Sequence, residues 1–227
     1  MSILKEFSRF ADSYNRINII QKDVARELVK QLDREYNSIL DIGCGGGEIY
    51  KNIIKSGIEF KNLKAIDISS NMIDIHPEDD RVELQVMSFD DKRLLENRYD
   101  IVISSSALQW SEDLDYTLNN ISKLSNRFIF GIFTANTFKS VHKLANIESP
   151  IYKKEYLIKK IDRYFNASYR TLSYKLYFEN SYDMLKYIKE SGVNGGGKKL
   201  SFREIKNIIN NYPYRYLEFE ILIVEVK

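Results

Sequence analysis

The sequence contains very little cysteine and histidine. Its one cysteine, Cys44, cannot form a disulfide within the chain, and the two histidines, His76 and His142, are far apart and show no HxxxH spacing. A disulfide framework needs pairs of cysteines, and structural zinc sites need several cysteine or histidine ligands at short spacings. The composition therefore excludes an internal disulfide and predicts that no structural metal is bound.

Long apolar runs are missing as well. No charge-free stretch approaches the roughly twenty apolar residues that a helix needs to span a bilayer. The N-terminus carries Lys5, Glu6, Arg9 and Asp12 where a signal peptide would have an apolar centre. Both observations predict a cytoplasmic protein.

No strong excess of charge of either sign is present. The chain has 34 Lys and Arg against 32 Asp and Glu, a net charge of +2, which predicts no strong attraction of the whole chain to nucleic acid. The distribution is less even, because segment 139–175 holds nine basic residues and only three acidic ones. This segment is either a solvated helical surface or a docking surface for an acidic partner.

Glycine is scarce too, yet four of the ten glycines fall within the stretch 38–48. Aliphatic residues at 39, 40 and 42 precede them, and a helical pattern starts at Ile49. The short apolar run predicts a strand buried on both faces, and glycines let the backbone adopt positive φ and let a ligand approach the main chain. Because N–H groups of the following helix face such a turn, the stretch predicts a nucleotide-binding site.

The spacing of the glycines narrows the choice of nucleotide. A dinucleotide fingerprint has its third glycine where this chain has Glu48, and no Gly-Lys-Ser/Thr follows as in a triphosphate loop. Asp41 would repel phosphate but suits an ammonium or sulfonium group. Asp67 ends the expected strand 63–68, about twenty residues later, where an acid can accept both hydroxyls of a ribose. Together these features point to S-adenosylmethionine.

These residues resemble motif I and the acidic second-strand motif of the class I methyltransferases. The resemblance implies that Asp41 lies near the methionine part of the cofactor and that Asp67 holds the ribose. Cys44 is expected to be only a small residue in a tight turn, and Met72 either faces the adenine or fills the core. The expected cofactor-binding residues are Gln21, Asp41, Gly43, Cys44, Gly45, Gly47, Asp67, Ile68, Met72, Ser88, Phe89 and Ser104.

The role of residue 88 departs from the pattern of that class. Class I methyltransferases usually have an acid near this position, and here it is Ser88. Adenine recognition is therefore assigned either to Ser88 or to Asp90, and the choice is open.

Strand and helix patterns alternate up to residue 145, which predicts right-handed crossovers and a parallel sheet. The fold class expected is α/β: a Rossmann-like class I methyltransferase with a mostly parallel seven-stranded sheet, an antiparallel last strand, an N-terminal helical lid and an inserted cap after strand five. A single domain, 1–227, is expected to comprise N-terminal helices (1–36), a cofactor-binding core (37–145), a basic cap over the strand ends (146–170) and C-terminal strands and helices (171–227). The strands are expected at 38–42, 63–68, 82–87, 99–104, 127–133, 169–178 and 216–226.

Three further stretches narrow the resemblance. The N-terminal pattern Phe10-Ala-x-x-Tyr14 with Gln21-x-x-Val24-Ala25, the segment 104–110, and the segment 182–192 are similar to the malonyl-acyl-carrier-protein O-methyltransferases of biotin synthesis. That family methylates the free carboxyl of a malonyl thioester. The resemblance implies acyl carrier protein as the partner, and malonyl-coenzyme A remains an alternative carrier.

No general acid or base is expected in such a reaction. A carboxylate with a pKa of about 4 is already ionised at neutral pH, so it needs no base to become a nucleophile. The residues expected to orient the substrate are Tyr14, Gln109, Trp110 and one of two arginines, Arg163 or Arg170. Trp110 has an alternative role in packing a helix on the sheet.

Two other functions remain open at the level of sequence. The chain could methylate another small metabolite or RNA, or it could bind the cofactor as a non-enzymatic scaffold. The oligomeric state is also open, because no pattern in the sequence addresses it.

Overall fold

The structure is a computed structural model that describes residues 18–190 and 201–227. A seven-stranded sheet with strand order β3-β2-β1-β4-β5-β7-β6 forms its centre. Strands β1 to β5 are parallel, and β7 runs antiparallel to both β5 and β6. The strands are β1 (Glu35–Ile42), β2 (Glu59–Asp67), β3 (Val82–Val86), β4 (Ile101–Ser105), β5 (Phe128–Phe133), β6 (Ser168–Tyr177) and β7 (Tyr216–Val226).

The seven strands expected from the sequence are all present, and the antiparallel last strand is confirmed. The strand order reverses between β1 and β4, and ligands of open α/β sheets bind beyond the strand ends at this switch point. We call the edge where β1 to β5 end the carboxyl edge, and the edge where they begin the amino edge. The glycine-rich stretch follows β1 and therefore lies at the carboxyl edge.

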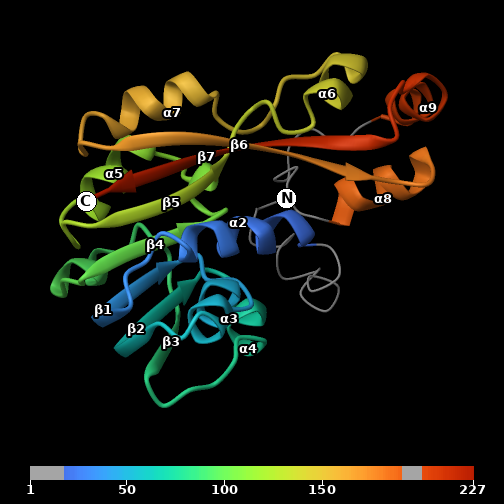
Figure 1. Ribbon diagram of the computed structural model, residues 1–227. Helices are drawn as coiled ribbons and strands as arrows, with labels where there is room; N and C mark the ends of the chain where they lie inside the picture. The colour runs from blue at the N-terminus through green and yellow to red at the C-terminus, as the bar shows by residue number, and fades with distance from the viewer. Residues whose placement is uncertain (1–17, 191–200) are drawn as a thin grey trace.

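Helices cover both faces of the sheet (Figure 1). On one face α2 and α3 pack on the sheet within a single core cluster. On the other face α5 and α7 pack side by side within a second cluster. The helices are α2 (Ile19–Val29), α3 (Glu48–Lys55), α4 (Ser70–Asp74), α5 (Leu114–Ile121), α6 (Lys139–Ala145), α7 (Lys154–Ile161), α8 (Ser181–Glu190) and α9 (Phe202–Asn211), with 3-10 turns η1 (Lys92–Glu96) and η2 (Leu108–Trp110).

Helix α7 lies in segment 146–170, the stretch that the sequence predicts as a cap over the strand ends. Leu157 and Ile161 of α7 are fully buried among apolar residues of the sheet and of α5. These residues form the apolar face of a helix that covers the sheet itself. Helix α6 follows β5 and contacts α9, and the Asn207 side chain donates to the Leu144 carbonyl over 3.1 Å.

Helix α2 lies unusually close to the sheet. A Cβ atom on Gly131 of β5 would come within 2.6 Å of Val24 Cγ1 and 3.4 Å of a Leu28 methyl. Only glycine permits this approach, because any larger residue would push the helix outward. The face of this helix that packs on the sheet is apolar, since Val24, Ala25 and Leu28 are all buried. A first helix expected before residue 18 lies outside the described residues.

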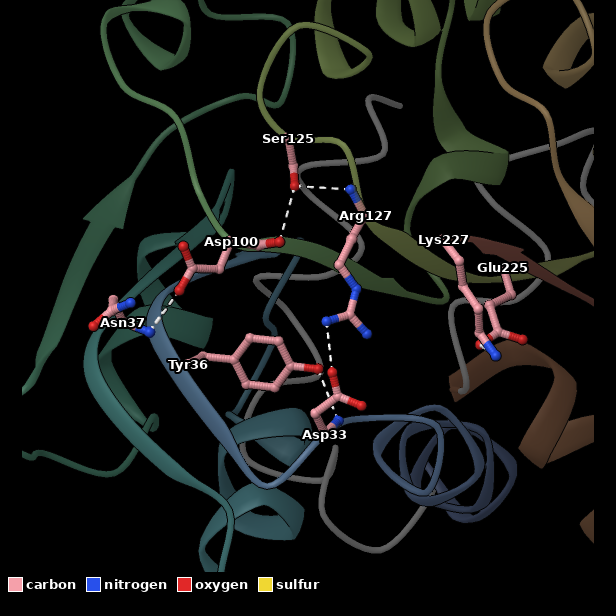
Figure 2. A network of polar contacts seen from close by, with 8 residues as sticks. All are labelled: Asp33, Tyr36, Asn37, Asp100, Ser125, Arg127, Glu225 and Lys227. Atoms are coloured by element: carbon pink, nitrogen blue, oxygen red, sulfur yellow. Dashed lines mark hydrogen bonds and ion pairs between the residues drawn. The ribbon is translucent and has the colours of Figure 1, made fainter.

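Polar contacts at the amino edge show in which direction α2 runs (Figure 2). Asp33, just beyond the helix, accepts a bond from the Arg127 guanidinium over 2.6 Å. Its backbone N–H donates to the Tyr36 hydroxyl over 2.8 Å. Because Arg127 immediately precedes β5, the carboxyl end of α2 lies at the amino edge. The helix therefore runs antiparallel to β5, and its amino end reaches the carboxyl edge.

Two helix starts differ in how they are capped. Ser201 caps α9 in a complete capping box with Glu204. Ser111, which lies between β4 and α5, does not cap α5. Its hydroxyl bonds that of Thr117 over 2.8 Å, and Asp113 caps α5 instead. The reason is that η2 occupies residues 108–110, so the helix begins later than its apolar pattern suggests.

Candidate functional site

The glycine turn, residues 43–47, connects β1 to α3 in a tightly enclosed path. Gly43, Gly45 and Gly47 all adopt positive φ, at +71°, +52° and +82°. A Cβ on Gly43 would lie 2.3 Å from the Ala107 Cβ, and one on Gly47 would lie 2.7 Å from the His76 ring. Both the left-handed backbone and the lack of space therefore require glycine. A ligand bound at the turn would therefore contact the main chain directly, because the glycines carry no side chains.

Asp67 at the end of β2 is held by backbone donors. One carboxylate oxygen accepts from the Gly45 N–H over 3.0 Å and the other from the Ser69 N–H over 2.9 Å. Burial raises its pKa, and these N–H donors oppose that rise. Each oxygen keeps a further lone pair, so the carboxylate is oriented and can still accept the two hydroxyls of a ribose.

Asp41 at the end of β1 is the most unusual group in the site. Its side chain is fully buried, and neither carboxylate oxygen has a hydrogen-bond partner in the structure. Burial, and secondly the nearby charge of Asp67, raise the pKa of Asp41 to about 8. A buried carboxylate becomes ionised at neutral pH only when a cation or strong donor joins it. The pair Asp41 and Asp67 therefore fits a ligand that carries both a cation and a ribose, and the expected S-adenosylmethionine is such a ligand.

Three other residues near these two acids differ in their exposure to solvent. Ile68, directly after Asp67, is 49% exposed and could cover one face of a base. Met72 of α4 is buried, which agrees with core filling. Burial and the nearby Asp41 charge raise the pKa of the Cys44 thiol well above its usual range, so this cysteine is not a reactive thiolate.

Residues after β3 and β4 are held by contacts with neighbouring segments. The Ser88 hydroxyl accepts from the Asp90 N–H over 3.2 Å, while the Asp90 carboxylate accepts from the Thr117 hydroxyl over 2.5 Å. Phe89 packs against the core cluster on the α5 face. The Ser104 hydroxyl donates to the Ile42 carbonyl over 2.9 Å, so it ties β4 to β1 at the switch point.

The loop after β4 has a constrained backbone and unpartnered side chains. Ser106 adopts φ +61°, and its N–H donates to the Gly131 carbonyl over 2.7 Å. The Gln109 amide donates to the Ser106 carbonyl over 2.5 Å. The Ser106 hydroxyl and the Gln109 carbonyl oxygen are buried without a partner. Trp110 packs against the core cluster on the α2 face, as its alternative role requires.

The amino end of α2 carries one polar residue that sequence reasoning missed. Asn18 is 1% exposed, and both polar atoms of its side chain lack a partner. The Gln21 carbonyl oxygen is also buried and unpartnered. Its spacing to Gln21, Ala25 and Leu28 is the signal that could have found it, because that spacing places Asn18 on the helix face that packs on the sheet.

The two arginines expected to hold the substrate lie on opposite faces of the sheet. Arg163 pairs with Asp115 of α5 over 3.1 Å, and Lys160 also pairs with this carboxylate. Arg170 lies 3.9 Å from Glu27 of α2. Neither of these contacts is at the carboxyl ends of β1 and β4, so the structure does not bring either arginine together with Gln109. Tyr14 lies outside the described residues.

Among residues 18–190 and 201–227, no group of three or more histidine, cysteine, aspartate or glutamate side chains gathers in a way that could hold a metal ion. None of their helices combines the length and apolar character needed to cross a membrane.

Comparison with known proteins finds a family model that matches part of the chain. Residues 40–126 match the family model of the methyltransferase domain. This range contains the glycine turn, Asp41, Asp67 and the loop after β4.

Curated relatives carry the name malonyl-[acyl-carrier protein] O-methyltransferase. One from Bacillus cytotoxicus is 32% identical over 151 residues, which cover 61% of this chain and 52% of the relative. Another from Calditerrivibrio nitroreducens is 26% identical over 216 residues, covering 91% of this chain and 85% of the relative. The chain thus spans about half the length of the first of these relatives.

Solved structures agree on the fold. The YcgJ protein from Bacillus subtilis matches with a TM-score of 0.62 at 16% identity, covering 90% of this chain and 98% of that one. At this identity the match concerns the arrangement of the strands and helices, and the chemistry has to be read from the site.

Proposed function

We propose that this chain, a class I methyltransferase by its fold and by the methyltransferase domain at residues 40–126, transfers a methyl group from S-adenosylmethionine to the free carboxylate of a malonyl thioester. The observation that carries the proposal is the pair of acids at adjacent strand ends. Asp41 is buried and unpartnered, and Asp67 is oriented by two backbone donors. The names of the relatives support the malonyl substrate.

The residues of the chain contribute binding and alignment. When bound, S-adenosylmethionine supplies a methyl group already activated by a positively charged sulfur. Asp41 would accept the cationic methionine end, Asp67 the ribose hydroxyls, and the glycine turn would lie against the nucleoside. A carboxylate acceptor is ionised at neutral pH, so the chain needs to supply position and exclusion of water more than proton transfer.

Acyl carrier protein is the proposed carrier, with the cytoplasm as the proposed compartment. Several basic residues of segment 139–175 are paired within the chain, for example Lys154 with Glu220 and Arg163 with Asp115. Lys139 and Lys143 of α6 are exposed and follow β5 at the carboxyl edge. These two lysines are therefore the proposed contacts for an acidic carrier protein.

The direct test is incubation of the chain with labelled S-adenosylmethionine and malonyl-acyl carrier protein. A labelled methyl ester is the expected product. Cofactor binding without any methyl ester on malonyl-acyl carrier protein or malonyl-coenzyme A would disprove the substrate, and would favour a scaffold or another acceptor. Strongly salt-dependent binding of RNA would favour the RNA alternative.

A charge reversal tests the carrier. The double variant Lys139→Glu and Lys143→Glu should raise KM for malonyl-acyl carrier protein about tenfold and leave KM for malonyl-pantetheine unchanged, because only the carrier protein reaches these lysines. The matched control reverses Lys61 and Lys123, two exposed lysines at the amino edge. Equal effects from both pairs would contradict docking at α6.

A further inference from the structure

Buried polar side chains without partners gather where the amino end of α2 meets the loop after β4. Val24 contacts Gly131, whose carbonyl accepts from the Ser106 N–H. One helical residue rises 1.5 Å, so Gln21 lies about 4.5 Å and Asn18 about 9 Å closer to the carboxyl edge than Val24. The first turn of α2 thus extends over the ends of β4 and β5, where Ser106 and Gln109 lie.

Asn18 is placed like a helix cap but does not act as one. Asparagine at this position normally accepts a bond from an N–H of the first turn. Here the Asn18 side chain makes no capping bond, and the first turn of α2 contains no acidic residue. The N–H groups of a first turn have no partner within their helix and carry a partial positive charge. The amino end of α2 is therefore arranged to receive an anion or strong acceptor.

Two donors in this region are buried and unpartnered. They are the Asn18 amide nitrogen and the Ser106 hydroxyl. Asn18 is 1% exposed and Gln109, next to Ser106 in space, is 4% exposed. Leaving such groups unpaired is unfavourable, so a ligand that accepts hydrogen bonds would satisfy them.

This region lies beside the seat of the cofactor. Asp41, Asp67 and the glycine turn belong to β1 and β2, whereas α2 covers β4 and β5, and the two parts meet where Gly43 approaches Ala107. In-line displacement requires the acceptor to approach the methyl group from the side away from the sulfur that leaves. An acceptor opposite a cofactor seated on β1 and β2 would lie over β4 and β5.

We infer that Asn18, Ser106 and the first turn of α2 form the binding site for the acceptor carboxylate. This inference rests on the proposed function and names its substrate-binding residues. Neutral donors would orient the carboxylate while leaving it more nucleophilic than an arginine pair would, because no full positive charge draws on its lone pairs. Both arginines expected from the sequence are paired with acids on the two faces of the sheet.

The test is a binding experiment that does not depend on turnover. The chain is saturated with S-adenosylhomocysteine, and malonyl-pantetheine or its neutral methyl ester is titrated by calorimetry. The wild-type chain should bind the carboxylate at least tenfold more tightly than the ester. Asn18→Ala and Ser106→Ala should each weaken carboxylate binding about tenfold, as loss of a hydrogen bond to a charged group predicts. Asn18→Asp should weaken it further, because it places a like charge beside the carboxylate.

Controls separate a binding role from a structural one. Asn119→Ala changes an exposed asparagine of α5 and should leave both affinities unchanged. Binding of S-adenosylhomocysteine should be unaltered in Asn18→Ala and Ser106→Ala. If these variants lose cofactor affinity and carboxylate affinity by the same factor, the residues belong to the cofactor seat and the inference is overturned.

A panel of carboxylates distinguishes failure of the inference from failure of the proposed substrate. Succinyl-pantetheine and benzoate are titrated in the same way, each against its methyl ester. If malonyl-pantetheine does not bind but another carboxylate binds in a manner that depends on Asn18, the malonyl substrate is wrong and the carboxylate site stands. If no carboxylate is preferred over its ester, the inference is overturned.

Discussion

The two edges of the sheet treat their polar side chains in opposite ways. At the amino edge the groups satisfy one another (Figure 2): the Asp100 carboxylate accepts from the Asn37 and Ser38 N–H groups over 2.6 and 3.2 Å. The Ser125 hydroxyl donates to the Asp100 carbonyl over 3.1 Å and accepts from the Arg127 N–H over 3.0 Å. At the carboxyl edge, Asn18, Asp41, Ser106 and Gln109 are buried with unpartnered atoms.

A hollow in the surface does not by itself mark a binding site. A hollow of about 550 Å³ at the amino edge is lined by Tyr36, Asp100, Ser125 and Arg127. These groups already bond one another, so a ligand there would find few unsatisfied donors or acceptors. A buried polar group that lacks a partner lowers the stability of the ligand-free chain. A ligand that forms a hydrogen bond with this group removes that free-energy cost. The unpartnered polar groups at the carboxyl edge are therefore a better indicator of a binding site than the hollow at the amino edge.

The largest effect should come from Asp67→Ala. Loss of two hydroxyl bonds to a carboxylate costs about 3 kcal/mol or more, so affinity for S-adenosylhomocysteine should fall at least about 100-fold by calorimetry. Asp100→Ala at the amino edge is the matched control. It should lower the melting temperature and leave cofactor affinity unchanged. Unchanged affinity in Asp67→Ala would remove the ribose assignment.

Gly43 and Gly57 have similar positive φ angles but different surroundings, so alanine variants at the two positions distinguish the effect of steric crowding from that of backbone strain. Gly43→Ala places a Cβ 2.3 Å from that of Ala107 at φ +71°, whereas Gly57→Ala at φ +66° meets nothing within 4 Å. Overpacking adds to strain in the first variant, so Gly43→Ala should lower the free energy of unfolding by about 2–4 kcal/mol and Gly57→Ala by about 1 kcal/mol. Denaturant unfolding measures both. Equal losses would show that Ala107 can move aside.

Asp41 should make stability and binding depend on pH. Its pKa is about 8 in the folded chain and 3.8 in an unfolded one, so between these values the folded chain holds a proton that the unfolded chain has released. Stability of the ligand-free chain should therefore fall as pH rises from 4 to 8, by at most about 1.4 kcal/mol per pH unit from this group.

Asp41→Asn should remove that slope and be more stable than wild type at pH 8. Binding of S-adenosylmethionine should release a proton from wild type, because a cation beside the carboxyl lowers its pKa. Calorimetry in buffers of different ionisation enthalpy measures this release. Proton release that persists in Asp41→Asn would assign it to another group.

The smallest effect is expected at the amino edge. The Arg127–Asp33 pair is partly exposed, and pairs of this kind contribute about 0–1 kcal/mol. Arg127→Ala should lower the melting temperature by only a few degrees and leave cofactor affinity unchanged. A loss of cofactor affinity in this variant would break the contrast between the edges, because it would show that the amino edge controls the position of α2.

Sequence patterns predicted those features that depend mainly on neighbouring residues, such as strands and tight turns. Alternation of apolar residues predicted β7 at 216–226 with both ends correct, and the glycine turn followed from spacing alone. Asp67 could be placed because the end of β2 must lie beside the end of β1 in a parallel pair.

The remainder depended on packing between distant segments. The apolar residues of α7 show from the sequence that one face of the helix is buried. That this face packs against the sheet and α5 is visible only in the structure. The positive φ of Ser106 arises where the loop after β4 meets Gly131 and the glycine turn, and no residue type marks it. Asn18 could have been found from its place on the apolar stripe of α2, yet its lack of a capping bond is visible only in three dimensions.

Gly131 sets the thickness of the layer between α2 and the sheet, and it does so from a position that touches no proposed ligand. Asn18 and Gln21 belong to the helix, while Asp41 belongs to the sheet, so the spacing of these two layers sets the separation between the acceptor and cofactor halves of the site. A methyl group added at Gly131 would act as a wedge between them. We expect Gly131→Ala to slow methyl transfer while both ligands still bind, and Val24→Ala in the same chain to restore the rate by making room for the wedge.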